Sequence, residues 1–230
     1  MASSQPIRVA VSGAAGRIAY SLVFRIAAGG LFGRDQPVAL HLLELPEVEH
    51  QLRACELELK DCAFPLLAEL HSSVDPRVAF AGADWIILLG GKPIRPGLNN
   101  RLELLRENAP IMVEHGRAIN QVAPMARILV VTTPSNTNCM VARSKAQDVP
   151  PEHWFALNQV IRMRATGLIA EKAGVPASEV SRIVIWGNNS ESALIDLHAA
   201  RIGDRPALEV IGDPDWVKNH LVPTVANRAW

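Results

Sequence analysis

The sequence has no net charge, few cysteines and no long apolar run, and each of these absences argues against a class of protein. Its 230 residues include 23 basic and 23 acidic side chains, so it lacks the positive excess that nucleic-acid and membrane-surface binders carry. The longest apolar runs, such as residues 85–89 (WIILL), are far too short to span a bilayer. Three cysteines form no disulfide framework and no Cys-x-x-Cys metal pair. We expect no nucleic-acid, membrane or metal partner.

What is present is typical of a folded protein. Apolar residues make up 49% of the chain and charged residues 20%, with a mean hydropathy of +0.12. The length allows one large domain, or one and a half of ordinary size. The first residues, MASSQPIRVAV, show no basic segment followed by an apolar signal core, so export is not expected. Together with the scarcity of cysteine, this predicts a cytoplasmic location.

Short β-branched runs alternate with helical stretches in the first part of the chain, residues 1–155. The pattern predicts strands at residues 7–12, 38–43, 85–89 and 128–131, and helices at residues 18–28, 48–67 and 98–123. Strands that alternate with helices of crossover length favour a parallel sheet covered on both faces. The prediction is therefore an α/β fold with a doubly wound parallel sheet.

The pattern changes after Pro150-Pro151. We expect a helix over residues 159–173, a strand over 182–186, extended pieces at 195–202 and 207–210, and a final helix from near Asp213. Residues 156–230 are predicted to form a second, partial domain.

A glycine-rich turn follows the first predicted strand and precedes the first predicted helix. It reads Gly13-Ala14-Ala15-Gly16-Arg17-Ile18. Missing Cβ atoms let phosphates approach the backbone, and the unpaired N–H groups of a helix N-terminus attract a pyrophosphate. The alternative is an ordinary tight turn between a strand and a helix, but the context favours nucleotide binding.

Glu44 directly follows the second predicted strand. A carboxylate there can accept hydrogen bonds from an adenosine ribose and repels a 2′-phosphate, which favours NAD over NADP. The alternative is a solvated acid at the end of a strand.

Several segments resemble the malate dehydrogenase family, in particular its cytosolic-type branch. In chain order they are VSGAAGRIAYSLVFRIAAG, LELKDCAFPLLAEL, KPIRPG, TTPSNTN, RATGLIAEKAGVP and IVIWGNNS. The resemblance implies a homodimeric, NAD-dependent 2-hydroxy-acid oxidoreductase, with a Rossmann domain followed by a mixed α/β substrate domain. Dimer contacts are implied around residues 61–65. The family continues beyond the position of Trp230, so we expect a contact between subunits to cover faces left open there.

The resemblance also implies the positions that contact the cofactor. They are the turn residues Gly13, Ala14, Ala15, Gly16, Arg17 and Ile18, together with Glu44, Gly90, Gly91 and Asn108. His115 falls where the family often places a glutamine that contacts the cofactor. The alternative for His115 is a histidine on the surface of a helix.

The catalytic residues of the family are not carried over. Family members use a histidine base held by an aspartate, because a proton must leave the hydroxyl as hydride departs. Asn189 occupies the histidine position in WGNNS, and Ile161 occupies the aspartate position in VIRMR. A neutral amide cannot serve as a base, so the catalytic residues are unknown.

The implied substrate pocket has changed as well. Its candidate residues are Arg164, Thr133, Arg95, Asn189 and Arg162. Arg164 matches a substrate-binding arginine and could hold a carboxylate through two hydrogen bonds. The alternative for Arg164 is an arginine in an ion pair on a helix surface, and a cluster of ion pairs accounts equally for Arg162.

The residues leave three hypotheses for function. The first is an NAD-binding relative of malate dehydrogenase that lacks the ordinary activity and serves another reaction on a small carboxylate or carbonyl compound. The second is a non-catalytic NAD-binding subunit or sensor. The third is a dehydrogenase with a different base, such as Glu191 or a residue of a partner chain.

Overall fold

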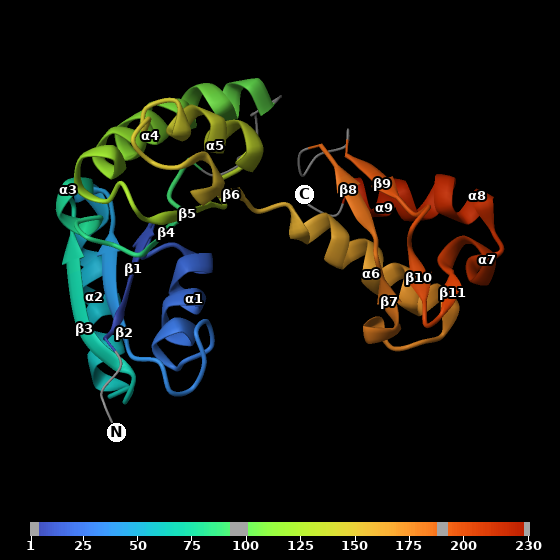
Figure 1. The fold of residues 1–230 in the computed structure, drawn as a ribbon, viewed down its shortest axis with the longest axis horizontal. Coiled ribbons are helices and arrows are strands. Elements are labelled where there is room, and N and C mark those ends of the chain that lie inside the picture. The colour runs from blue at the N-terminus through green and yellow to red at the C-terminus, as the bar shows by residue number, and fades with distance from the viewer. Residues whose placement is uncertain (1–4, 93–100, 188–192, 228–230) are drawn as a thin grey trace. The chain divides into compact units, whose positions relative to one another are not determined.

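The computed structural model describes residues 5–92, 101–187 and 193–227 (Figure 1). The chain forms two compact units, Met1–Ala156 and Leu157–Trp230. Among the described residues, no helix combines the length and the apolar character needed to cross a membrane.

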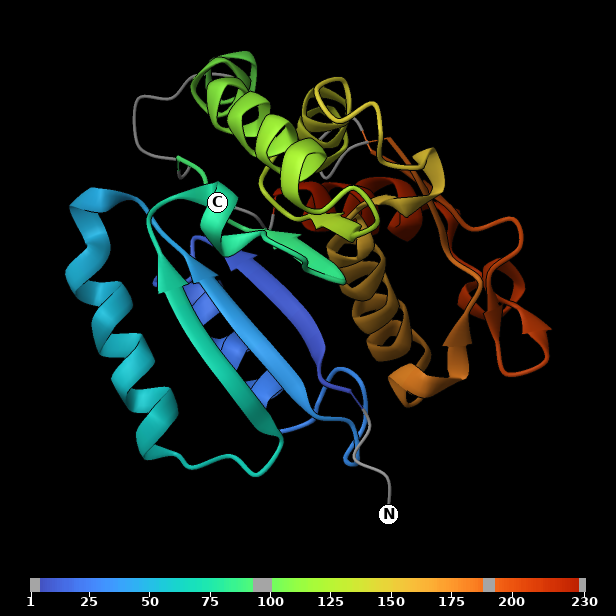
Figure 2. The same ribbon diagram turned by 60° about the vertical axis from the view of Figure 1, so that its left-hand side comes forward.

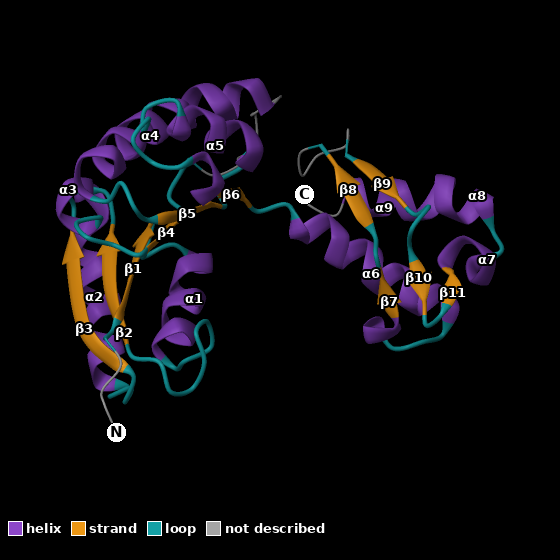
Figure 3. Cartoon of the chain, viewed as in Figure 1, coloured by secondary structure: helices purple, strands orange, loops and turns teal. Residues whose placement is uncertain are grey.

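A single parallel sheet organises the first unit, with the strand order β3-β2-β1-β4-β5-β6 (Figure 3). Its strands are β1 (Ile7–Ser12), β2 (Val38–Leu43), β3 (Leu67–Ser73), β4 (Trp85–Leu88), β5 (Arg127–Val130) and β6 (Trp154–Ala156). The helices are α1 (Arg17–Ala27), α2 (Glu49–Asp61), α3 (Pro76–Ala79), α4 (Arg101–Val122) and α5 (Ser135–Arg143). The predicted α/β fold with a doubly wound parallel sheet is confirmed.

Each face of this sheet is covered by its own set of helices. Val9 and Val11 of β1 face α1 and α2, where they join an apolar cluster with side chains such as Val23. Ala10 points to the opposite face and packs in a second cluster with side chains of α4 and α5. This alternation follows from the two-residue period of a strand. Figure 2 shows the sheet between α2 and α4.

The strand order reverses between β1 and β4, which are neighbours in the sheet. The chain from β1 goes outward to β2 and β3, then returns to the other side of β1 through β4. The loops that leave β1 and β4 therefore diverge to opposite sides. In open parallel sheets, ligands bind at this reversal, beyond the carboxyl ends of the strands.

The sequence-based prediction was wrong between residues 62 and 73. We expected one helix over residues 48–67, but α2 ends at Asp61 and the edge strand β3 begins at Leu67. The β3 sequence, LAELHSS, has no β-branched aliphatic residue, and its side chains are only partly buried. A half-covered edge strand lacks the apolar periodicity by which strands are predicted. In addition, α5 and β6 had no predicted counterpart.

The second unit is built around α6 (Gln159–Ala173), which was predicted with the same bounds. Gly174 ends this helix in the left-handed conformation, with φ of 68°. The remaining elements are β7 (Val180–Ser181), β8 (Val184–Trp186), β9 (Leu194–Asp196), β10 (Arg201–Ile202), β11 (Arg205–Pro206), α7 (Ala207–Ile211), α8 (Pro214–Trp216), a π-helical turn (Val217–Leu221) and α9 (Val222–Asn227). They form a β11-β10-β7 sheet and a β8-β9 hairpin.

Three expectations for the second unit were wrong. The extended piece at residues 207–210 is the helix α7, which Pro206 precedes and Gly212 ends. Proline at a helix start and glycine after its end are helix-boundary signals, and here they outweigh strand propensity. The extended piece at 195–202 is broken by a turn between β9 and β10. Arg182 has a positive φ of 58°, so the strand expected from 182 begins only at Val184.

Candidate nucleotide-binding site

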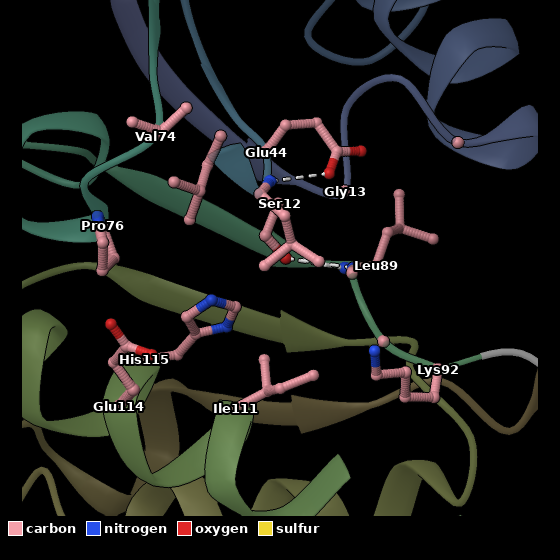
Figure 4. A pocket seen from close by; sticks show the side chains of 15 residues that line it. Ser12, Gly13, Glu44, Val74, Pro76, Leu89, Lys92, Ile111, Glu114 and His115 are labelled. Atoms are coloured by element: carbon pink, nitrogen blue, oxygen red, sulfur yellow. Dashed lines mark hydrogen bonds between the residues drawn. The ribbon is translucent and has the colours of Figure 1, made fainter. Parts of the chain in front are cut away.

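A pocket of about 220 Å³ lies at the reversal of strand order (Figure 4). One side is formed by Ser12, the last residue of β1, and by Gly13, Glu44 and Gly90, which lie beyond the ends of β1, β2 and β4. Side chains of α4, among them His115, form another side. The first unit therefore supplies a concave site at the place where its topology predicts one.

The floor of the pocket is a close approach of two backbones. Gly13 has a φ of 68°, and a Cβ atom placed on it would lie 2.5 Å from the Cα atom of Gly90. The Ser12 hydroxyl oxygen accepts hydrogen bonds from the N–H groups of Leu89, at 3.2 Å, and Gly90, at 3.1 Å. These bonds join the loops that follow β1 and β4. Only glycine meets both the conformation and the spacing required at position 13.

The glycine turn leads directly into the N-terminus of α1. Gly16 precedes the helix without any side-chain cap, and the first turn carries no acidic residue. The N–H of Gly16 donates to the carbonyl of Gly13 at 2.9 Å, which closes the turn. The N–H groups at the start of α1 are thus free of side-chain competitors, which suits an anion such as a phosphate.

Glu44 connects this turn with the end of β2. Its Oε1 accepts a hydrogen bond from the N–H of Ala15 at 3.1 Å, and its Oε2 accepts one from the N–H of Leu45 at 2.9 Å. A carboxylate offers about four acceptor positions, so ribose hydroxyls can still bind. Glu44 is therefore hydrogen-bonded to the glycine turn, and is not an acid that contacts solvent alone.

The other residues of the turn lie around the pocket without lining it. Ala14 is fully buried, while Arg17 and Ile18 are exposed, Ile18 by 68%. These positions belong to the turn and to the first turn of α1, and none of the three lines the pocket.

His115 is a buried wall of the pocket. The residue is 7% exposed, and its ring meets the ring of Phe80 edge to face at 5.4 Å. Among the described residues, its Nδ1 atom has no hydrogen-bond partner. Burial lowers the pKa of His115 to about 4, so the ring is neutral at pH 7. The alternative of a surface histidine is therefore wrong. His115 therefore contributes a neutral, buried ring to the wall of the pocket.

We expect the free energy of unfolding of the His115→Gln variant to depend less on pH below about pH 6.5 than that of the parent chain. Between about pH 6.5 and pH 4, the unfolded chain binds a proton at this histidine that the folded chain does not, so stability falls as the pH falls. The contribution reaches about 3 kcal/mol below pH 4. Urea unfolding at a series of pH values measures it. His50→Gln, at an exposed position of α2, is the control. Equal slopes for the two variants would contradict the prediction.

Gly91, Asn108 and Thr133 hold the frame of the site. The fully buried Asn108 accepts a hydrogen bond from the N–H of Lys92 at 2.7 Å and donates to the carbonyl of Thr133 at 3.3 Å. A Cβ atom on Gly91 would lie 2.4 Å from Cγ2 of Thr132. Asn108 thus fastens the loop after β4 to the loop after β5, and these bonds occupy its side chain.

The predicted substrate-pocket residues of the second unit do not converge. Arg162 is exposed and lines a hollow with Arg182, whereas Arg164 is half-buried and donates from Nη1 to the carbonyl of Val225 at 3.4 Å. Residues two apart on a helix point to different sides. Arg95 and Asn189 lie outside the described residues.

Ile161 is 1% exposed and packs in the apolar cluster of the second unit. Its neighbours in that cluster include Ala165 and Leu221. The position is therefore an element of the apolar core.

Sequence reasoning missed several residues of the pocket. Ser12 and the apolar wall formed by Val74, Pro76 and Ile111 were not predicted. The available signal was their position, since Ser12 ends β1 and Val74 follows β3. Both lie at carboxyl ends of parallel strands, where ligands bind.

A parallel sheet with a glycine turn, a free helix N-terminus and a carboxylate after its second strand defines a dinucleotide-binding protein of the Rossmann type. Residues 7–156 match the NAD binding domain of lactate/malate dehydrogenase, and residues 161–230 match the alpha/beta C-terminal domain of the same family. The chain belongs to the lactate/malate dehydrogenase family. Its predicted cofactor, NAD, is confirmed at the level of this domain.

Individual relatives resemble the chain over nearly all of its length. A malate dehydrogenase of Magnetococcus marinus is 45% identical over 225 residues, which are 98% of this chain and 68% of that protein. The crystal structure of malate dehydrogenase from Naegleria fowleri has a TM-score of 0.92 and 41% identity, covering 98% of this chain and 69% of that one. Trichomonas vaginalis lactate dehydrogenase, in complex with NADH and oxamate, has a TM-score of 0.91 and 35% identity, covering 97% and 68%.

Proposed function

We propose that the chain binds NAD in its first unit, lacks ordinary malate dehydrogenase activity, and serves another reaction on a small carboxylate or carbonyl compound. The proposed loss of activity is supported chiefly by Ile161, which is buried among apolar side chains. The resemblance implies an aspartate at this position, as the partner of the catalytic base. The proposal assigns residues 1–155 to the dinucleotide and residues 156–230 to the substrate.

The residues of the first unit fit a dinucleotide. The contact of Gly13 with Gly90 leaves backbone without side chains where a pyrophosphate needs room, and the start of α1 offers N–H donors. Glu44 would hold the ribose and His115 would meet the adenine. When bound, NAD supplies the hydride acceptor at its nicotinamide ring.

The second unit would hold the substrate through Arg164. A guanidinium can bind a carboxylate through two parallel hydrogen bonds, and Arg164 uses Nη1 for one long bond, to the carbonyl of Val225, among the residues that the structure describes. Asn189 belongs to the same unit and would join Arg164, whereas Arg162 lines a different hollow and is not part of the proposed set. An asparagine at position 189 would orient a carbonyl through a hydrogen bond but would not remove a proton.

Two measurements test the proposal. NADH fluorescence titration should show binding to the purified chain. Malate oxidation should be slower than in ordinary dehydrogenases by about 10²–10⁴-fold, the usual contribution of a positioned base. Turnover of malate at an ordinary dehydrogenase rate would refute the proposed loss of activity. Bound NADH without turnover of any carboxylate or carbonyl compound in a panel would favour a non-catalytic subunit or sensor.

A dimer and a cytoplasmic location belong to the same proposal. The resemblance supports the dimer, and three free cysteines suit a reducing compartment. Light scattering of the purified chain at micromolar concentration tests the dimer, and a uniform monomer would contradict it.

We expect Glu44→Gln to weaken the preference for NADH over NADPH. The substitution removes the negative charge that repels a 2′-phosphate, so the ratio of NADPH to NADH affinity should rise at least about tenfold. Fluorescence titration with each dinucleotide measures the ratio. Glu47→Gln removes the same charge from an exposed position in the next turn and should leave the ratio unchanged. An equal change in both variants would point to a general effect of charge.

A further inference from the structure

A second group of polar side chains lies on the sheet of the first unit, apart from the nucleotide pocket. His41 of β2 pairs in register with His71 of β3, and Glu69 precedes His71 by two residues. Residues two apart on a strand, and residues opposite each other on neighbouring strands, share a face of the sheet. One ligand atom from each of the three residues lies within 4.8 Å of the others. None of the three lines the nucleotide pocket.

His41 is buried and presents one nitrogen without a partner. Its Nδ1 lies 3.0 Å from the carbonyl oxygen of Ala79 in α3. A carbonyl can only accept, so Nδ1 carries the proton and Nε2 carries a free lone pair. The residue is 8% exposed, and its buried Nε2 atom has no hydrogen-bond partner in the described parts of the chain.

This arrangement is the one by which proteins orient a histidine that binds a metal ion. A backbone carbonyl that accepts from one ring nitrogen fixes the tautomer and turns the other nitrogen toward the metal. The histidine is therefore set for a ligand that accepts an electron pair.

The side chains of His71 and Glu69 are exposed and already lie close to each other. The side chain of His71 is 66% exposed and that of Glu69 is 49% exposed, with 3.9 Å between Nε2 of His71 and Oε2 of Glu69. The rings of His41 and His71 meet edge to face at 5.3 Å. Ligand atoms around a tetrahedral zinc ion lie about 3.4 Å apart, given metal–ligand bonds of about 2.0–2.1 Å. The ligand atoms of the three residues lie within 4.8 Å of one another, so rotations of the exposed side chains of Glu69 and His71 can bring them to the spacing that zinc requires.

We propose that His41, Glu69 and His71 bind a divalent transition-metal ion of the Zn²⁺ type, with water at the remaining position. Two imidazoles and one carboxylate favour zinc over magnesium, which prefers oxygen ligands alone. Arg8, on the neighbouring strand β1, opposes a cation with its positive charge, and its guanidinium donates to the carbonyl of Gly82. The carboxylate of Glu69 offsets this charge. The inference does not depend on the proposed function.

Zinc titration of the chelator-treated chain by calorimetry tests the site. We expect one Zn²⁺ per chain, with no comparable heat from Mg²⁺. His71→Ala should weaken zinc binding at least about tenfold, since it removes one of three protein ligands. Because His71 is exposed, this variant should fold as the parent does, and circular dichroism checks that. His50→Ala removes an exposed histidine from α2 and should leave the affinity unchanged.

NMR spectra of the histidine ring nitrogens test whether the zinc ion binds at His41. On addition of zinc, the Nε2 resonance of His41 should shift in ring-nitrogen NMR spectra, while Nδ1 keeps its proton. Unchanged zinc affinity in His71→Ala would overturn the proposal, as would loss of binding in Cys62→Ser, which would place the ion at the exposed thiol. Either result would leave NADH binding untouched, so the two proposals fail separately.

Discussion

Gly13→Ala should abolish measurable NADH binding and destabilise the first unit. The new Cβ atom would lie 2.5 Å from Cα and 2.7 Å from the backbone nitrogen of Gly90. Both are backbone atoms, so no side-chain rotation relieves the overlap, and the loops after β1 and β4 must separate. We expect a loss of NADH affinity of at least about 100-fold, equivalent to about 2.7 kcal/mol. Fluorescence titration measures this loss.

Gly174 provides a matched control for Gly13→Ala. It has the same φ of 68°, but a Cβ atom placed on it would meet no atom of the described residues within 4 Å. Gly174→Ala should therefore cost only the conformational strain of the left-handed region, about 1–2 kcal/mol. Urea unfolding should show the larger loss for Gly13→Ala. Equal losses, together with unchanged NADH affinity in Gly13→Ala, would mean that the contact with Gly90 does not form the site.

The double variant Ile161→Asp, Asn189→His should gain malate oxidation. It would restore a titratable base and its carboxylate partner, a pair that typically contributes about 10²–10⁴-fold. The rate of NADH formation with malate measures the gain, and its pH profile should show the titration of a histidine near neutrality.

The single variants separate the roles in this pair. Ile161→Asp alone would bury a carboxylate among apolar side chains, so it should lower stability by several kcal/mol. Asn189→His alone would supply a base without its partner and should gain less. A folded, NADH-binding double variant no faster than the parent would show that the loss of activity is not local to this pair.

Much of the fold could be predicted from the sequence where local and tertiary signals agree. β1 and β2 are buried, β-branched or leucine-rich runs beside turn residues, and both were predicted with their observed bounds. α6 ends at a glycine, and its bounds were also predicted. β3 was missed because its edge position removes the apolar pattern, and α7 was missed because five residues are too few to show a helical period.

Some residues of the candidate site could likewise be predicted from the sequence, and others could not. The role proposed for Gly13 could be predicted because it lies in a turn between a strand and a helix, and that of Glu44 because it follows the end of a strand. The burial of His115 could not, because it depends on how α4 crosses the sheet. The pairing of His41 with His71 depends on a strand that was not predicted, so no spacing in the sequence indicates it.

The hydrogen bonds of Asn108 have a consequence for the thermodynamics of ligand capture. Because a fully buried amide already fastens the segments after β4 and β5 to each other, their conformational entropy is lost during folding and not during association. A dinucleotide that arrives at this edge need not immobilise those segments. Calorimetry of the parent chain should accordingly give a small entropic penalty, and an Asn108→Ala chain that still folds should bind with a more favourable enthalpy offset by a larger entropic loss.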